Sequence, residues 1–158
     1  MRSDTIPSRR AVLAGLAVGL TLGRAALAKG LPTVAVTKDP SCGCCGKWVA
    51  HMREAGFAVT VTEAPVNPLK IRLGVPRELA SCHTAQVGGY VVEGHVPAGA
   101  IKRLLAERPE GTGLAVPGMP LGSPGMEVGG MEPDTYEVVL FGKDGRSPFA
   151  RYRGGEPA

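Results

Sequence analysis

Hydrophobic and polar positions follow two different periods in the first half of the chain. Leu31–Thr37 (LPTVAVT) is a short β-branched run and Phe57–Thr62 (FAVTVT) alternates apolar with polar residues, so both predict strands. Between them, Ser41–Gly56 has apolar residues at helical spacing and ends on a glycine, which predicts a helix. The order is therefore strand, cysteine-bearing turn, helix and strand.

The second half predicts further short elements and one long loop. Thr84–Val92 predicts a hairpin, and Pro97–Arg108 predicts a helix with proline at its start. Asn67–Val75 predicts a short helix or turn. Glu110–Pro133 is rich in Gly, Pro and Met without a usable period, which is typical of a functional or mobile loop. Tyr136–Phe141 predicts a last strand, followed by a short polar tail.

Strands that alternate with helices around a cysteine-bearing first turn indicate an α/β fold. The pattern predicts a thioredoxin-like single domain with a long Gly/Pro/Met-rich loop. The whole chain has 158 residues, and neither a repeat nor a linker divides it after residue 28. This length suits one small hydrophobic core.

Residues 1–28 have the composition of an export signal. Arg9-Arg10 precedes a glycine-diluted apolar stretch, and Ala26-Leu27-Ala28 has the small-x-small pattern of a cleavage site. The paired arginines predict twin-arginine (Tat) export. An apolar stretch of about 12 residues is too short for a membrane anchor, which needs roughly 20. We expect a signal peptide over 1–28, a soluble chain over 29–158, and delivery to the periplasm.

The positive charge of the chain comes mainly from this signal. The formal net charge is +4, and the first 28 residues contribute +3 through four arginines and one aspartate. Binding to a nucleic-acid backbone requires clustered Lys and Arg. The nearly neutral remainder argues against nucleic acid as a partner.

Four cysteines carry the candidate chemistry. Cys42, Cys44 and Cys45 lie in SCGCCG, and Cys82 lies in SCHT. At the start of a helix, the partial positive charge of the N-terminus lowers a thiol pKa, and the resulting thiolate is both a nucleophile and a metal ligand. Structural disulfides that join Cys42 or Cys45 to Cys82 are an alternative. Zinc is another, although its structural sites usually pair two separated cysteine knuckles.

Soft ligands elsewhere favour monovalent copper. Thiolate and thioether sulfur select Cu(I) over hard cations. Met119 and Met126 lie between Gly and Pro residues of the long loop and are candidate ligands, whereas Met52 is assigned to the core. Met131 fits either role.

The histidines and the tryptophan have weaker signals. His83 follows Cys82 and is a candidate copper ligand or a partner that steers the thiolate. We expect His95 to lie in the second shell of the site and His51 to lie on the helix surface. Trp48 is one helical turn beyond Cys44, and we expect it to cover the site or pack in the core.

Four motif blocks span about two thirds of the chain after the signal: Cys42–Trp48, Ser81–Ala85, Glu93–Ala98 and Gly118–Glu127. Together they resemble the CopG-type periplasmic copper-resistance proteins, long known as a domain of unknown function. The resemblance implies a thioredoxin-like fold that binds copper as a cysteine-bridged multinuclear cluster in copper homeostasis. The ligands that it implies are Cys42, Cys44, Cys45 and Cys82, with Met119 and Met126 as weaker candidates.

The leading hypothesis is a periplasmic protein that holds more than one Cu(I) ion and exchanges it with a donor or acceptor protein. A thiol–disulfide oxidoreductase is an alternative, with Cys42 as the attacking thiol and Cys45 or Cys44 as the resolving thiol. A copper-dependent redox protein is a second alternative, so the sequence leaves open whether the chain is an enzyme. A structural module would instead have four bonded, inert cysteines.

Overall fold

A computed structural model of the chain describes residues 30–158, so the predicted signal peptide lies outside the described residues. The fold is mixed α/β, as the sequence predicts, and no helix within 30–158 is both long and apolar enough to cross a bilayer. The elements in chain order are β1 (Val34–Lys38), α1 (Gly43–Glu54), β2 (Val59–Glu63), α2 (Asn67–Arg72), the 3-10 helix η1 (Arg77–Leu79), β3 (His83–Val87), β4 (Tyr90–Glu93), α3 (Ala98–Glu107), β5 (Gly113–Ala115), β6 (Thr135–Gly142), β7 (Gly145–Arg153) and β8 (Glu156–Pro157).

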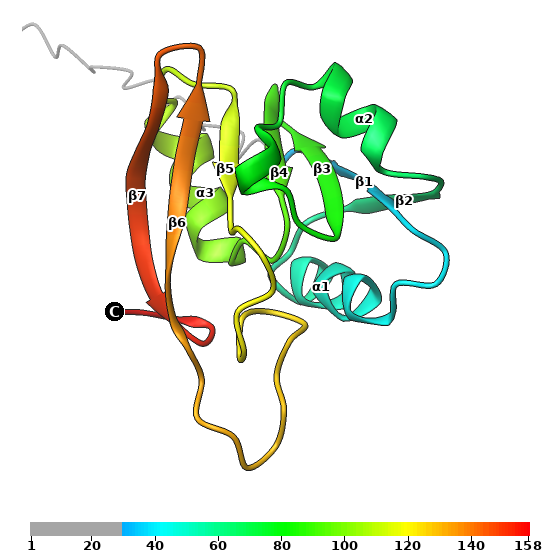
Figure 1. Ribbon diagram of the computed structural model, residues 1–158, viewed down its shortest axis with the longest axis vertical. Coiled ribbons are helices and arrows are strands. Elements are labelled where there is room, and N and C mark those ends of the chain that lie inside the picture. Colours follow the sequence, from blue (N-terminus) through cyan, green and yellow to red (C-terminus); the bar gives the residue numbers. More distant parts are fainter. Residues whose placement is uncertain (1–29) are drawn as a thin grey trace, which may run out of the picture.

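All eight strands form one sheet in the order β2-β1-β3-β4-β5-β6-β7-β8 (Figure 1). β1 runs parallel to β2 and β4 runs parallel to β5, while the other neighbouring strands are antiparallel. Parallel neighbours need a crossover connection, and α1 and α3 provide the two that this sheet requires.

The two faces of the sheet are covered by different helices. Trp48, Val49 and Met52 of α1 and Ile101 and Leu104 of α3 belong to one large buried cluster against the first face. A smaller cluster on the opposite face packs under the segment that contains η1, and it consists of Leu79, Val91, Ala115 and Phe141. Neighbouring residues of a strand point to opposite faces, so β4, β5 and β6 each supply both clusters. Met52 lies in the core, as predicted.

The prediction of a polar tail after Phe141 was wrong. Residues 145–153 form β7, which pairs along β6, and β8 adds a short final strand. Most side chains of β7 are exposed, so the strand lacks the hydrophobic alternation that a sequence pattern can detect. Tyr152 nevertheless stacks on Tyr136 with 6.3 Å between the ring centroids. The long loop also contains one unpredicted strand, the three-residue β5.

His51 does not lie freely on the helix surface, so that prediction was also wrong. It is half-buried between α1 and the start of α3, where its Nε2 accepts a hydrogen bond of 3.1 Å from the backbone N–H of Ala98. The first N–H groups of a helix have no partner within the helix. His51 therefore joins α1 to the N-terminus of α3.

The pH dependence of stability tests this contact. Burial lowers the pKa of His51 below its ordinary value, and only the uncharged imidazole can accept the hydrogen bond from the Ala98 N–H. A group with a lowered folded-state pKa stabilises the fold above its unfolded pKa and loses this contribution as the pH falls. We expect the free energy of unfolding to fall as acidification proceeds below about pH 6.5. His51→Gln keeps an acceptor without the titration, so urea denaturation should give it a shallower pH dependence; an unchanged slope would contradict the assignment.

Candidate metal centre

Three of the four cysteines lie at the connection between β1 and the start of α1, as predicted. Cys42 is the N-cap residue of α1, and Cys44 and Cys45 follow in its first turn. The turn before the helix is closed by Asp39, whose Oδ1 accepts hydrogen bonds from both the backbone N–H and the hydroxyl of Ser41. The local sequence thus fixes the position of this cysteine cluster.

The fourth cysteine reaches the cluster through strand pairing. β3 runs antiparallel to β1 and places His83 opposite Lys38, the last residue of β1. Cys82 therefore lies beside the end of β1, where α1 begins, and its Sγ is 4.0 Å from the Sγ of Cys44. All four Sγ atoms lie within 4.8 Å of one another.

One pair of these cysteines is bonded. A disulfide joins Cys42 to Cys45, while Cys44 and Cys82 are free thiols. Cys44 remains 3.5 Å from the Sγ of Cys42. The bond is the C-x-x-C pairing, and it is not the alternative pairing of Cys42 or Cys45 with Cys82.

Two histidines contact Cys82 directly. Its Sγ is 3.3 Å from Nδ1 of His83 and 3.0 Å from Nε2 of His95. The sequence predicted the contact of His83 with this thiol, whereas His95 was expected in the second shell, without direct contact with a cysteine. Both histidine side chains are fully buried, and their rings meet edge to face with 5.1 Å between centroids.

The buried surroundings keep these groups uncharged. Burial, together with the neighbouring Cys44 thiol, raises the pKa of the Cys82 thiol to about 11. Burial also lowers the pKa of His95 and lowers that of His83 well below its usual value. Metal binding at Cys82 must therefore displace a proton from the thiol, whereas the imidazoles are already in their ligating form.

Trp48 belongs to the hydrophobic core and packs against His83, next to the cysteine cluster. Its side chain is fully buried, and its ring centroid lies 4.4 Å from that of His83. The indole Nε1–H donates to the backbone carbonyl of Val96 at 2.9 Å. The expectation that Trp48 packs in the core is therefore confirmed.

A buried charged network holds the backbone next to Cys82. Lys70 and Glu93 form an ion pair at 2.5 Å, and both are almost completely buried. The Glu93 carboxylate also accepts hydrogen bonds from the hydroxyl of Thr84 and the backbone N–H of Ser81, at 2.7 and 2.6 Å. Since Ser81 precedes Cys82, this network fixes the direction from which the thiol approaches the site.

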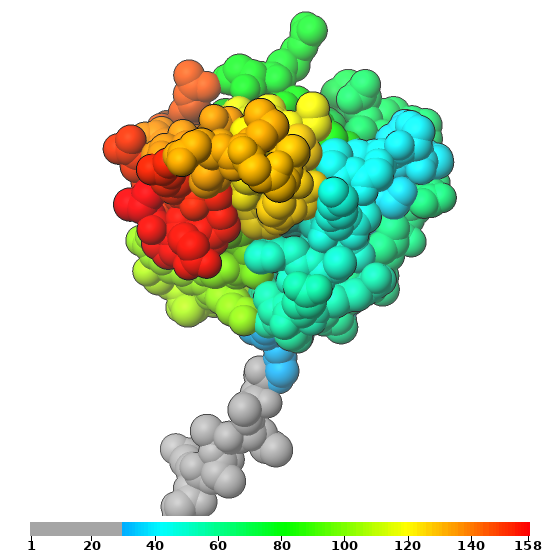
Figure 2. All heavy atoms as spheres, turned by 90° about the horizontal axis from the view of Figure 1, so that it is seen from below, coloured from blue at the N-terminus to red at the C-terminus, as the bar shows by residue number. Residues whose placement is uncertain are grey.

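The long loop packs over the cysteines. Figure 2 shows its yellow and gold residues against the cyan start of α1. The Ser81 hydroxyl donates to the carbonyl of Gly118, and His95 Nδ1–H donates to the carbonyl of Pro124. A Cβ at Gly125 would lie 2.8 Å from both the Cys44 carbonyl oxygen and the Trp48 nitrogen, and its φ of +91° favours glycine. Only a glycine allows the loop to approach α1 this closely.

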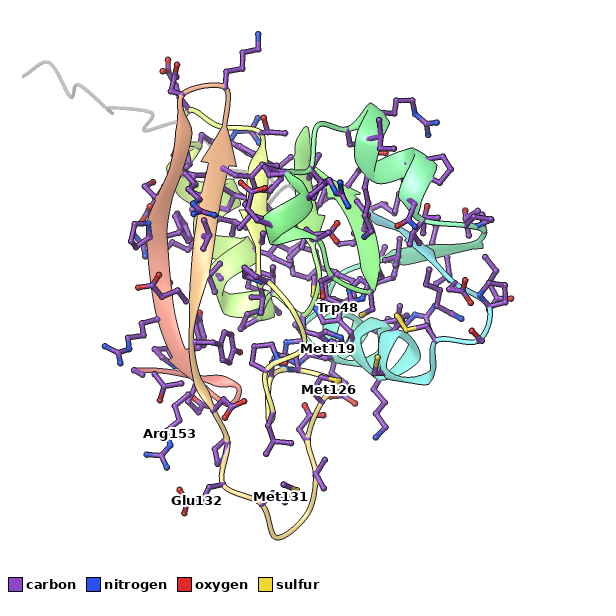
Figure 3. The ribbon with its side chains drawn as sticks, viewed as in Figure 1. Trp48, Met119, Met126, Met131, Glu132 and Arg153 are labelled. Atoms are coloured by element: carbon purple, nitrogen blue, oxygen red, sulfur yellow. A yellow bond between two sulfur atoms is a disulfide. The ribbon has the colours of Figure 1, made fainter. Side chains whose placement is uncertain are left out.

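The three loop methionines have different positions. Met126 lines a cavity of about 360 Å³ together with Cys44 and Lys47. Met119 is 54% exposed. Met131 lies at the far end of the loop with Glu132 (Figure 3) and is 58% exposed. Of two larger cavities in the described part of the chain, one lies by the β6–β7 turn and the other between η1 and the strands β6 and β7, and neither is lined by a cysteine, histidine or methionine.

Fold and site together define an α/β protein with a sulfur-rich cluster that can hold a metal ion. Comparison with solved structures identifies its relatives. Two structures of copper resistance protein CopG, described as form 1 and form 2, match with 45% and 47% sequence identity and a TM-score of 0.72 in each case. The matches cover 78% and 77% of this chain and 99% and 98% of the CopG chains.

The chain therefore belongs to the CopG family of copper-resistance proteins. A family described as a protein of unknown function, DUF411, matches residues 79–126, which include Cys82, both buried histidines and the part of the loop up to Met126. No curated protein matches the chain.

Substitution of Glu93 tests the anchoring role of the Lys70–Glu93 pair. Glu93→Gln leaves the Lys70 charge buried without a counter-charge, and breaking a buried pair in this way costs about 3–5 kcal/mol. We expect a loss of this size in the free energy of unfolding, measured by chemical denaturation. Glu107→Gln is the matched control, because its partner Arg103 and Glu107 itself are both about half exposed and such pairs contribute about 0–1 kcal/mol. Equal losses in the two variants would contradict the anchoring role.

Proposed function

We propose that this protein binds Cu(I) through the thiolates of Cys42, Cys44, Cys45 and Cys82 and serves in copper homeostasis or resistance. The observation that carries the proposal is the gathering of four Sγ atoms within 4.8 Å of one another. Two relatives bear the name copper resistance protein. Thiolate sulfur is a ligand type that selects Cu(I), and in this proposal copper is the cargo of the protein.

The cargo site requires the reduced protein. With the Cys42–Cys45 disulfide closed, two of the four sulfurs cannot act as thiolates. Reduction supplies four thiolates in one small volume, and a thiolate that bridges two ions allows few sulfurs to hold more than one Cu(I). We therefore propose a multinuclear cluster in the reduced state.

Three further side chains are proposed as auxiliary ligands. His83 has a ring nitrogen 3.3 Å from the Cys82 sulfur, and Met126 shares a cavity with Cys44. Met119 lies on the same loop and is partly exposed. Thioether sulfur suits a transient contact with an entering Cu(I) ion because it is soft and uncharged.

We propose that the domain is thioredoxin-like. Its first half has a β1–α1–β2 crossover, and a β3–β4 hairpin and α3 follow, with strand order β2-β1-β3-β4. The C-x-x-C pair lies at the start of the crossover helix, which is the position expected for this motif. Strands β5 to β8 extend this unit on one side.

We also propose export to the periplasm by the signal at 1–28 and exchange of copper there with a donor or acceptor protein. An oxidising compartment suits a disulfide such as Cys42–Cys45. The nearly neutral residues 29–158 favour an ion or a protein as the partner over nucleic acid.

Metal content tests the copper-binding proposal. Reduced protein loaded with Cu(I) under anaerobic conditions should bind more than one copper per chain by elemental analysis. The double variant Cys42→Ser/Cys45→Ser should lose this cluster, because only two thiolates remain. Met131→Leu is a suitable control, since Met131 lies at the distal end of the loop. Full stoichiometry in the double variant would refute the thiolate cluster.

Thiol–disulfide exchange is a second candidate function, favoured by the disulfide at the start of α1. Cys42 is partly exposed and Cys45 is fully buried, so a client thiolate would attack Cys42. The Cys42–Cys45 bond breaks, Cys45 leaves as a thiolate, and a mixed disulfide forms. A second client thiol then displaces Cys42 and leaves with the disulfide.

This candidate predicts repeated turnover without metal. Metal-free protein should oxidise a reduced client over many cycles when glutathione disulfide restores the Cys42–Cys45 bond. Cys42→Ser should abolish turnover, whereas Cys82→Ser should retain it. A rate no higher than that of glutathione disulfide alone would refute the enzyme function.

A further inference from the structure

β2 is an edge strand of the sheet, and its outer side has no partner strand among residues 30–158. Figure 1 shows it on the opposite side of the molecule from β7. Four of its five residues are exposed, and its sequence VTVTE is rich in the β-branched residues that favour strands. We propose that this edge pairs with β2 of a second copy of the chain, so that two sheets join in a symmetric dimer.

The opposite edge of the sheet is protected against such pairing, whereas the β2 edge is not. Native proteins protect an edge strand with proline, basic side chains or a bulge. At the other edge, β7 contains Pro148 and several arginines, its pairing with β6 is interrupted between Val138 and Val139, and β8 covers its end. β2 has neither proline nor a basic residue and pairs with β1 in unbroken register. Its one charged residue, Glu63, lies at its end.

The backbone of β2 presents its outward hydrogen-bonding groups at alternate residues. The carbonyl of Ala58 and the N–H of Ala64 both bond to β1, so every second residue from Ala58 onward faces that strand. The N–H and C=O groups of Val59, Val61 and Glu63 therefore point away from the sheet. Such a row of groups is a template for another strand.

An antiparallel pair centred on Val61 uses all of these outward groups. Val61 then lies opposite the partner's Val61, and Val59 lies opposite the partner's Glu63. Directly opposed residues of this kind exchange both of their hydrogen bonds. On the other face, Thr60 lies opposite the partner's Thr62, which is a favourable cross-strand pair. Because a register centred on Val59 or Glu63 leaves some outward groups unpaired, the strand is complementary to itself in one register.

Charge complementarity supports the same register. Glu63 points to the face of the sheet that α1 covers, since it alternates with Val59, which packs against the core cluster under that helix. In the antiparallel pair, the partner's Glu63 reaches the start of β2, which a short connection joins to the last turn of α1. Arg53 lies in that turn, is exposed, and forms no ion pair with a residue in 30–158. Glu63 contacts Lys38 at 2.8 Å, but its side chain is 56% exposed and can accept a second cation.

The small contact area predicts a weak dimer. A strand of this length spans about 17 Å, whereas specific stable interfaces bury about 1,200–2,000 Å². Two short strands and two ion pairs provide less than this area. We therefore expect the dimer to form at high protein concentration and to dissociate on dilution.

Each candidate metal centre remains within one chain in this dimer. Cys42 follows β1, and β1 runs parallel to β2, so the cysteine cluster lies at the Glu63 end of β2. The antiparallel pairing places the partner's cluster at the opposite end of the joined sheet. The proposal therefore does not rest on the proposed copper function, and copper stoichiometry per chain should be the same in monomer and dimer.

The association state of the unsubstituted protein tests the proposal. Sedimentation equilibrium from about 1 μM to 1 mM should show a dimer that increases with concentration, without larger species, because the pairing closes on itself. Val61→Lys places a charge at the centre of the strand and should weaken association by at least about tenfold. Val128→Lys is the matched control, since Val128 is an exposed valine of the long loop. A monomer at every concentration, or equal weakening in both variants, would overturn the proposal.

Exchange of charges tests the register. Arg53→Glu and Glu63→Arg should each weaken association, and the double variant should recover it, because the two charges then attract again. Lys143→Glu is the control, since Lys143 is exposed at the β6–β7 turn, far from β2. Weakening that adds up in the double variant would refute this register.

Hydrogen exchange of the unsubstituted protein covers the case in which a variant fails to fold. The amides of Val59, Val61 and Glu63 should gain protection as the concentration rises, whereas those of Thr60 and Thr62 bond to β1 and should be protected throughout. Equal protection of the outward amides at every concentration would indicate a cover within the same chain. Protection that requires a different added protein would indicate another partner. Either result would overturn pairing with a second copy.

Discussion

The carboxylate of Glu93 is the group on which the geometry of the site depends. It lies at the end of β4 without contact to solvent and accepts hydrogen bonds from Lys70, Thr84 and the backbone of Ser81. One group thus joins α2, the β3–β4 hairpin and the segment that enters β3. A buried carboxylate is tolerated only when its hydrogen bonds and its charge are both satisfied, so these elements have little freedom to move independently.

The hydrogen bonds of Glu93 also determine how the candidate metal ligands are positioned. Ser81 is held on one side by Glu93 and on another by its hydroxyl contact with Gly118 of the long loop. The loop then returns to His95 through the Pro124 carbonyl and to α1 through the close approach of Gly125. Residues far apart in the sequence therefore position one thiol and one imidazole together. The long Gly/Pro/Met-rich loop therefore does more than connect two strands: its backbone positions residues of the site.

Local patterns predict the parts of this protein that depend on local interactions. The first strand, the helix that begins at the cysteines and the hairpin follow from hydrophobic period and turn residues. β7 was missed because most of its side chains are exposed and its pairing with β6 is a backbone property. β5 was missed because three residues are too few to establish a period.

In the site, Cys42, Cys44 and Cys45 are recognisable from their spacing. The contact of His95 with Cys82, by contrast, depends on the pairing of β3 with β4 and on the long loop. Glu93 ends the apolar run YVVE, and a charged residue at the end of such a run indicates that it could be buried. The sequence does not reveal its partner, because Lys70 lies on another element.

The buried charges also decide what the site can hold. Lys70 and Glu93 neutralise each other, so they leave no net charge to balance thiolates formed nearby. The Cys82 thiol is itself held in its protonated form by burial, with a pKa of about 11. An ion that enters must therefore supply the positive charge that the protein does not provide, and it must release the thiol proton as it binds. The number of thiolates that it meets is set by a single covalent bond, Cys42–Cys45. The oxidation state of that bond thus sets how many of the four sulfurs can act as thiolates.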